Sequence, residues 1–232
     1  MTNSKILVGI ALLCATVAIS AQECKSAVFF KEGSVLTYTQ YTKKGKVQGT
    51  NSHETLKVEQ IDGGMEAEFK TVVYDKKGKE TFSANYGAGC KNGLFTIDMM
   101  RFVDMGKLSE HNADDVELKV DGSVLSFHTN VSPGDMLEDG DISIKVNKSG
   151  FTLVTMTFNV FNRKIHEKEQ LTTPAGTFDC QVVTFDFESK IGIIKIKGTG
   201  KEWYLDDRAV VRSESYNKNG KLIDYYELSE IR

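Results

Sequence analysis

Aromatic and arginine side chains occur together in the second half of the chain. Trp203 and Tyr204 stand side by side, arginines follow at positions 208 and 212, and another arginine lies at position 163. Trp, Tyr and Arg favour recognition surfaces because each combines a large contact area with a polar or charged group. The alternative is structural, with a tryptophan that fills one end of a sheet and an arginine that pairs with Glu214. The predicted binding residues are Trp203, Tyr204, Arg163, Arg208 and Arg212.

No motif for nucleophilic catalysis is present. Many serine hydrolases carry their nucleophile on a Gly-x-Ser-x-Gly turn, and this pattern does not occur in the chain. There are four histidines, at positions 53, 111, 128 and 166, and among 32 acidic residues some stand near a histidine by coincidence. We therefore predict no catalytic residue and favour a non-enzymatic protein. A hydrolase whose site is assembled by folding stays open as the alternative.

Metal and phosphate sites are not predicted either. Zinc sites use closely spaced Cys or His pairs, and the chain has no Cys-x-x-Cys. The acidic run Glu138–Asp141 offers oxygen ligands, but its spacing departs from the regular calcium loop. Gly198-Thr199-Gly200-Lys201 is similar to the end of a phosphate loop, but Lys195 occupies the place of the first glycine, so we interpret it as a hairpin. We predict no metal and no cofactor.

The charge distribution argues against a nucleic-acid partner. The formal net charge is −3, and 24 lysines and five arginines are scattered among acidic residues rather than gathered in a basic stripe. The partner classes that remain are an apolar ligand or an envelope protein. A structural subunit, recognised by a self-complementary surface, is a further alternative.

Turn signals predict that a β-sheet positions these side chains. The pattern Tyr-x-Lys-x-Gly-Lys occurs three times, starting at Tyr41, Tyr74 and Tyr216. In each, a type I turn can lead into a glycine at positive φ and reverse the chain, which predicts three hairpins. Lysines at the tips could bind anionic partners, but solvated lysines also block edge pairing, and we prefer this second role.

Further turns and alternating strands extend the pattern. Pro174 and Gly176 predict a hairpin before the strand that contains Cys180, and Asp121-Gly122 predicts another. Met65, Ala67 and Phe69 share one face of a strand while charged residues share the other, as in an antiparallel sheet with one solvated side.

The expected fold is an all-β single domain, built from a strongly curved antiparallel sheet as a half-barrel or rolled sandwich. Residues 47–60 are long and mostly polar and predict an edge strand or a strongly curved one. Residues 98–112 contain apolar side chains near helical spacing, which predicts one or two short helices there.

The N-terminal residues predict export. Lys5 precedes an apolar run, Ile6–Ile19, which is too short to span a bilayer and is typical of a signal peptide. We expect a signal peptide over residues 1–21 and a single β-rich domain over 22–232, with no transmembrane segment after cleavage. Lipid anchoring is disfavoured, because neither Cys14 nor Cys24 follows a small residue.

Three cysteines remain after the predicted cleavage: Cys24, Cys90 and Cys180. In an oxidising compartment an odd number indicates one disulfide and one thiol. Cys180 alternates into a strand beside Val182 and is assigned to the core, so Cys24 and Cys90 are the predicted pair. Three free thiols are the alternative.

The order of motifs resembles the exported TapB-like proteins of Gram-negative envelopes, a family of unknown function related to a broader domain of unknown function. The resemblance rests on the Tyr-x-Lys-x-Gly-Lys turns, Asn162-Arg163-Lys164, the run Thr173–Cys180, Trp203-Tyr204 and Val211–Glu214. It implies a β-rich fold and a periplasmic or surface location, and it implies no catalytic residues. From the residues and the resemblance together, we expect a ligand-binding or assembly protein of the envelope.

Overall fold

The computed structural model describes residue 24 and residues 30–99, 116–122, 124–206 and 209–232. These residues form fifteen β-strands, and the all-β prediction is confirmed. The strands are β1 (Val35–Thr42), β2 (Val47–Ile61), β3 (Gly64–Asp75), β4 (Glu80–Lys91), β5 (Leu94–Asp98), β6 (Val116–Gly122), β7 (Val124–His128), β8 (Met136–Leu137), β9 (Gly140–Lys148), β10 (Phe151–Ile165), β11 (Glu169–Thr173), β12 (Gly176–Ile191), β13 (Ile194–Tyr204), β14 (Val210–Asn217) and β15 (Leu222–Ile231).

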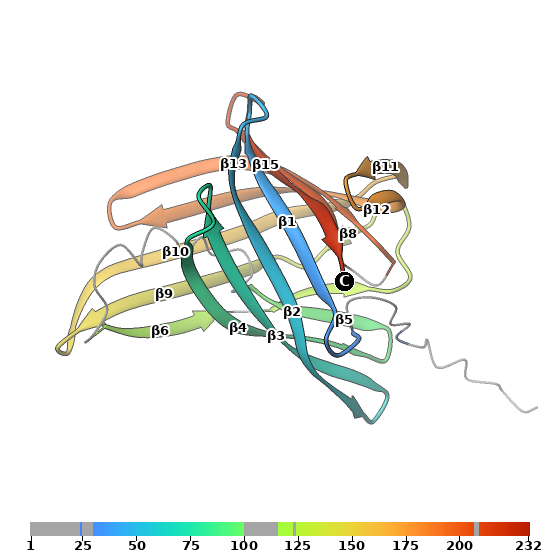
Figure 1. Cartoon of the computed structure of the whole chain (residues 1–232), viewed down its shortest axis with the longest axis horizontal. Helices are drawn as coiled ribbons and strands as arrows, with labels where there is room; N and C mark the ends of the chain where they lie inside the picture. Colours follow the sequence, from blue (N-terminus) through green and yellow to red (C-terminus); the bar gives the residue numbers. More distant parts are fainter. Residues whose placement is uncertain (1–23, 25–29, 100–115, 123, 207–208) are drawn as a thin grey trace, which may run out of the picture.

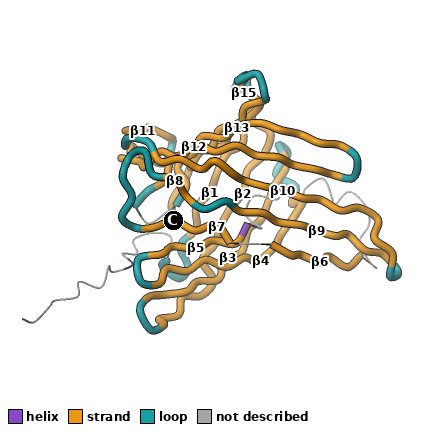
Figure 2. The backbone as a smooth tube through the Cα atoms, turned by 180° about the vertical axis from the view of Figure 1, so that it is seen from behind, coloured by secondary structure: helices purple, strands orange, loops and turns teal. Residues whose placement is uncertain are grey.

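The strands form one antiparallel sheet that curls into a nearly closed barrel (Figures 1 and 2). The order of strands is β6-β9-β10-β12-β13-β14-β15-β1-β2-β3-β4-β5-β7, with β11 paired to β12 and β8 paired to β10. The predicted curved antiparallel sheet is thus confirmed. Of the predicted helical segment, Asp98 ends β5, and residues 100–112 lie outside the described part of the chain.

The three Tyr-x-Lys-x-Gly-Lys motifs form the predicted hairpins β1–β2, β3–β4 and β14–β15. In each turn the glycine has a positive φ, +73° at Gly45, +76° at Gly78 and +70° at Gly220. The residue after each tyrosine fixes the turn, because its side chain accepts backbone N–H bonds from the second and fourth residues that follow it, as Asp75 does from Lys77 and Lys79. The Pro174 turn is likewise the hairpin β11–β12.

One prediction about connectivity is wrong, and one alternative of another is excluded. Asp121-Gly122 does not make a hairpin, since β6 pairs with β9 whereas β7 pairs with β5, at opposite ends of the strand order. β6 and β7 are separated by one residue in the sequence, and they lie at the two ends of the strand order. Residues 47–60 belong to β2, which is not an edge strand, because β1 and β3 pair with its two sides.

Gly198-Thr199-Gly200-Lys201 is also not a hairpin. It lies inside β13, and the turn from β12 to β13 falls earlier, between Ile191 and Ile194. Packing explains the glycines, because a Cβ atom on Gly200 would lie 2.2 Å from the ring of Phe185 and one on Gly198 would lie 2.7 Å from the ring of Phe187. The phenylalanine rings of β12 therefore lie across the two glycines of β13.

One end of the barrel is solidly packed. Buried aromatic rings from several strands contact one another there, with Phe69 stacked on Tyr86 at a centroid distance of 5.1 Å and Phe30 edge-on to Phe95 at 5.9 Å. Ile97, Leu125 and Leu228 complete the interior of this region and are almost fully buried. We call this the packed end.

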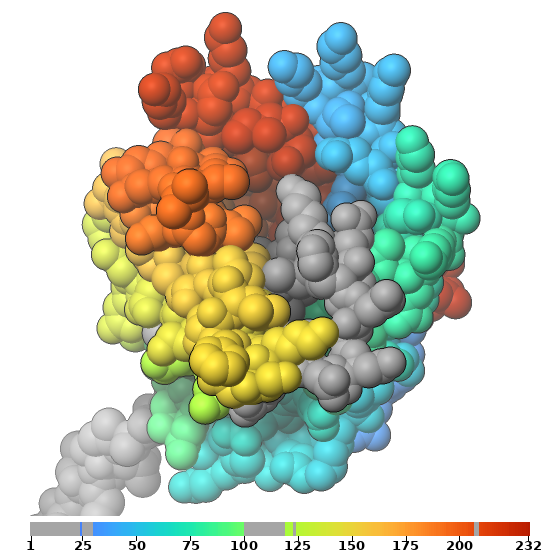
Figure 3. Space-filling view, turned by 90° about the vertical axis from the view of Figure 1, so that its left-hand side faces the viewer, coloured from blue at the N-terminus to red at the C-terminus, as the bar shows by residue number. Residues whose placement is uncertain are grey.

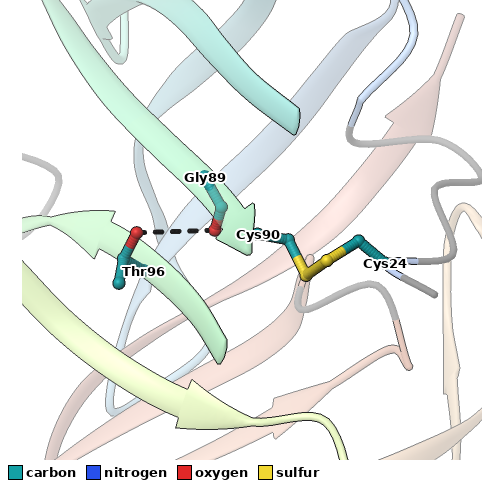
Figure 4. The surroundings of a disulfide bond; sticks show 4 residues. All are labelled: Cys24, Gly89, Cys90 and Thr96. Atoms are coloured by element: carbon teal, nitrogen blue, oxygen red, sulfur yellow. Dashed lines mark hydrogen bonds between the residues drawn. A yellow bond between two sulfur atoms is a disulfide. The ribbon is translucent and has the colours of Figure 1, made fainter. Parts of the chain in front are cut away.

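The disulfide Cys24–Cys90 joins the N-terminal part of the chain to the end of β4 (Figure 4). The predicted pairing is thereby confirmed, and Cys180 is a free thiol with no solvent exposure. The bridge spans a sequence separation of 66 residues. A loop of this length gives a stabilisation of about 4 kcal/mol on loop-entropy grounds.

Candidate binding site

Trp203 and Tyr204 lie on opposite faces of β13, because successive side chains of a strand alternate. Tyr204 faces the barrel interior at the packed end, where its ring centroid lies 5.1 Å from that of Phe127. Trp203 lies on the outer face in a small separate core with Cys180, Val182 and Val211, against which Leu171 of β11 packs. The two aromatic residues therefore serve different cores.

An ionic contact holds Trp203 in place. Its indole N–H donates to Oε2 of Glu169 over 2.8 Å, and Nζ of Lys201 lies 3.0 Å from Oε1 of the same carboxylate. Lys201 also lies over the Trp203 ring, 4.4 Å from its centroid. Burial by itself would raise the pKa of Glu169, but the bonds from Trp203 and Lys201 outweigh it and lower that pKa.

Arg163 points into the barrel because β10 contains a bulge. Strict alternation from Val160, which is buried in the core, would place Arg163 on the outer face. The pairing of β10 with β12 shifts between Phe161 and Lys164, and Asn162 has a φ of +54°. Asparagine tolerates this left-handed conformation, and the extra residue turns Arg163 inward.

Inside the barrel, Arg163 connects the two ends of the sheet. One guanidinium nitrogen, Nη1, donates to the carbonyl oxygen of Ser126 in β7 over 3.1 Å and to that of Glu138, just before β9, over 2.6 Å. The guanidinium lies 4.3 Å from the centroid of the Phe127 ring. The side chain of Ser126 also donates to Glu138 over 2.8 Å. Side chains therefore close the barrel where β7 approaches β9.

Arg212 is engaged on the outer face. Its guanidinium pairs with Glu214 at 2.7 Å and with Glu227 at 2.9 Å, and it lies 4.3 Å from the centroid of the Tyr225 ring. The contact with Glu214 is the one that the structural alternative predicts. Arg208 lies outside the described residues. The four described residues of the predicted binding set thus occupy an outer core, an inner core, a closure contact and a surface ion-pair network, and the fold does not bring them into one site.

A different surface offers a binding face. At the end of the barrel opposite the packed end, the interior side of β10, β12 and β13 is apolar but incompletely covered. Met156, Phe158 and Phe187 are only half-buried, with the rings of Phe158 and Phe187 5.9 Å apart. Ile194 and Ile196 share the face of Gly198 and Gly200, yet they are 61% and 46% exposed. We call these five side chains the apolar wall.

Alternation in β13 separates the apolar wall from a charged outer surface. Lys195 and Lys197, which alternate with the two isoleucines, lie 2.6 Å and 3.1 Å from the carboxylate of Glu188 on β12. Hydrogen bonds from both lysines lower the pKa of Glu188. The sequence Ile-Lys-Ile-Lys thus orients this hairpin, and its alternation is the signal by which the apolar wall could have been found in the sequence.

The interior side across the barrel from the apolar wall is polar. Ser215 of β14 pairs with Asp224 of β15, and Gln40 of β1 and Asn51 of β2 lie on the same interior face of the next two strands. All four residues are half-buried. Oδ1 of Asn51 is buried without a hydrogen-bond partner. An exposed apolar surface therefore faces a polar one at the same end of the barrel.

Two of the described histidines contact neutral hydroxyl groups. Nδ1 of His53 lies 2.9 Å from the hydroxyl of Tyr86, and Nε2 of His166 lies 2.7 Å from that of Thr184. Among the described residues, no group of three or more His, Cys, Asp or Glu side chains is arranged to hold a metal ion. The same part of the chain contains no helix with the length and apolarity needed to cross a membrane.

The fold and this interior define a class of protein: a nearly closed antiparallel β-barrel that is packed at one end and lined with uncovered apolar side chains at the other. The chain belongs to the DUF3108-like family, whose sequence pattern matches residues 31–228. This family has no established function, in agreement with the broader relationship that the sequence motifs implied.

Two solved structures share the fold over most of the chain. A candidate exported protein with a YmcC-like fold from Bacteroides fragilis is 27% identical, with a TM-score of 0.75, and the match covers 87% of this chain and 96% of that one. A candidate lipoprotein from Parabacteroides distasonis is 25% identical, with a TM-score of 0.73 and coverage of 90% and 100%. The comparison with curated proteins gave no match. The nature of these neighbours and the disulfide are both consistent with export.

Proposed function

We propose that this protein is a non-enzymatic binding protein of the bacterial envelope that holds an apolar ligand against the apolar wall. The observation that carries the proposal is the exposure of Ile194 and Ile196 on the interior side of β13. Soluble proteins rarely leave contiguous large apolar side chains uncovered on a curved inner surface, and such surfaces are characteristic of ligand sites.

The polar side of the interior favours an amphipathic ligand. An acyl chain or similar apolar group would lie along Met156, Phe158 and Phe187, while a polar group would reach the opposite strands. The unsatisfied Oδ1 of Asn51 supplies a hydrogen-bond acceptor on that side. The ligand class is therefore an amphiphile with a hydrogen-bond donor in its polar part.

The test is a titration of the purified protein with Nile red, an apolar dye that fluoresces when it leaves water. I194S/I196S is expected to bind the dye at least about tenfold more weakly, because each lost isoleucine contact contributes on the order of 1 kcal/mol. The matched control is K195S/K197S, which changes the alternate residues of the same strand on its outer face. This control should bind like the unchanged protein.

Equal affinities for both variants would contradict the proposal. Native mass spectrometry of the protein isolated from its own envelope supplies an independent measurement. A co-purifying amphiphile that is lost from I194S/I196S and retained in K195S/K197S supports the proposal, whereas a protein that carries no ligand and binds no dye overturns it.

The finer assignments remain predictions within this proposal. They are membership of the TapB-like proteins, a periplasmic or surface location in a Gram-negative bacterium, a signal peptide over residues 1–21 and one domain over 22–232. A recognition role for Trp203, Tyr204, Arg163, Arg208 and Arg212 also remains a prediction. The contacts of Trp203, Arg163 and Arg212 favour structural roles for these three.

A further inference from the structure

Five hairpin turns lie at the same end of the barrel as the apolar wall. Neighbouring strands run antiparallel in the order β9-β10-β12-β13-β14-β15-β1-β2-β3-β4, so successive turns alternate between the two ends of the barrel. The turns of the hairpins β9–β10, β12–β13, β14–β15, β1–β2 and β3–β4 fall at one end. In the space-filling view these turns surround one face of the molecule (Figure 3). We call them the hairpin rim, made of residues 148–151, 191–194, 217–221, 42–46 and 75–79.

Three neighbouring turns of the hairpin rim are rich in lysine. All the lysines of these turns are exposed, and the ion pairs found among described residues involve other lysines. Three acidic residues lie beside them: Asp75, whose carboxylate accepts backbone bonds within its own turn, the exposed Glu80, and the half-buried Asp224, which pairs with Thr42. The rim lysines are Lys43, Lys44, Lys46, Lys76, Lys77, Lys79, Lys218 and Lys221. In a chain with a net charge of −3, this is a local concentration of positive charge.

The other two turns of the hairpin rim carry exposed apolar side chains. Ile193 at the tip between β12 and β13 is 99% exposed, and Phe151 at the start of β10 is 76% exposed. These turns are neighbours, because the backbone N–H of Gly192 donates to the carbonyl oxygen of Thr155 in β10 over 3.1 Å. Neither side chain belongs to the apolar wall, and each extends from a hairpin tip.

We infer that the hairpin rim docks the protein onto a bilayer that contains anionic phospholipid. Exposed apolar tips can enter the interface between headgroups and acyl chains, and nearby lysines are attracted to the negative surface. The positive charge of the rim lysines is complementary to the negative charge of such a bilayer. The lysine turns and the apolar turns belong to one end of the barrel, so both can contact the bilayer together. Docking this way would place the end of the barrel that carries the apolar wall against the lipid, although the inference does not depend on what the wall holds.

The test is flotation of the purified protein with vesicles of phosphatidylcholine, with or without phosphatidylglycerol. Binding is expected only with phosphatidylglycerol and should weaken as salt is added. K43Q/K44Q/K46Q should bind at least about tenfold more weakly, since each lysine near an anionic surface contributes about a fivefold increase in affinity. F151S/I193S should bind the vesicles at least about tenfold more weakly, because it lacks the two apolar side chains at the hairpin tips.

Matched controls lie away from the hairpin rim. K57Q/K70Q/K91Q makes the same change in charge, and V124S/M136S removes two apolar side chains that are also exposed. Both controls should float like the unchanged protein. Docking is refuted if phosphatidylglycerol has no effect on binding, or if the rim variants and their controls bind equally. Nile red titration of I194S/I196S without vesicles tests the ligand proposal separately.

Discussion

At the scale of single residues, Cys180 is a thiol that the fold keeps unreactive. It is buried in the outer core beside Val182 and Trp203, and its Sγ–H donates weakly to the carbonyl oxygen of Phe178 over 3.7 Å. Burial raises the pKa of the thiol to about 11. Thiolate is the form that reacts with oxidants and disulfides, so the raised pKa keeps Cys180 as an unreactive free thiol.

This pKa predicts how stability depends on alkaline pH. In the unfolded chain the thiol has its ordinary pKa of 9.0, whereas in the folded protein burial raises this pKa to about 11. Between these values the unfolded state binds fewer protons, so the free energy of unfolding falls as pH rises, by about 1.4 kcal/mol per pH unit at most. Urea denaturation across this window should show a steeper decline for the unchanged protein than for C180A. Parallel declines would show that Cys180 ionises alike in both states.

At the scale of elements, β13 depends on two glycines that make room for aromatic rings. Phe185 and Phe187 of β12 lie across Gly200 and Gly198, so the neighbouring strand fills the space that side chains would occupy. Towards the turn the same face continues as Ile194 and Ile196, where no ring covers the strand to the same extent. One strand therefore changes along its length from tight packing to an exposed apolar surface.

G200A is expected to lower the free energy of unfolding by about 1–3 kcal/mol, because the added methyl group overlaps the Phe185 ring. The control is G87A in β4, where a Cβ atom would meet only a backbone oxygen at 4.0 Å. Combining G200A with F185A should cost less than the sum of the single changes, since the overlap disappears. Additive losses in denaturant titrations would show that the ring is not the cause.

At the scale of the whole molecule, closure of the barrel depends on one arginine as well as on the backbone. The chain from β6 to β7 links the two ends of the sheet, and beyond it Arg163 bonds to backbone on both sides of the junction. The Asn162 bulge that directs Arg163 inward is therefore part of the closure.

R163M should destabilise the protein by about 2–4 kcal/mol, because it leaves the carbonyl oxygens of Ser126 and Glu138 without their charged donor. It should also speed hydrogen exchange of β7 amides more than that of β2 amides. The control is K164M, which removes one positive charge, as R163M does, but at the adjacent exposed residue. It should change the free energy of unfolding by less than about 0.5 kcal/mol. A loss confined to K164M, or an R163M protein with unchanged stability, would show that Arg163 does not hold the junction.

Local chemistry made much of the fold predictable. Turn geometry depends on a few adjacent residues, so the three lysine hairpins and the Pro174 hairpin were correctly predicted. Asp121-Gly122 was misleading: the residue types suit a turn, but the two flanking strands do not pair with each other, since β6 pairs with β9 and β7 pairs with β5. The glycines of β13 were misread as a turn for a similar reason, since their cause is the aromatic rings of another strand.

Sequence alone determined the all-β class, the hairpins that reverse the chain and the disulfide pair, because each follows from residues that act locally or from a count of cysteines. The tertiary structure decided where side chains meet. It placed Trp203 and Tyr204 in different cores and turned Arg163 inward through a bulge, and it gathered lysine and apolar turns on one rim. Those outcomes depend on strand order and register, which are set by packing between residues far apart in the chain.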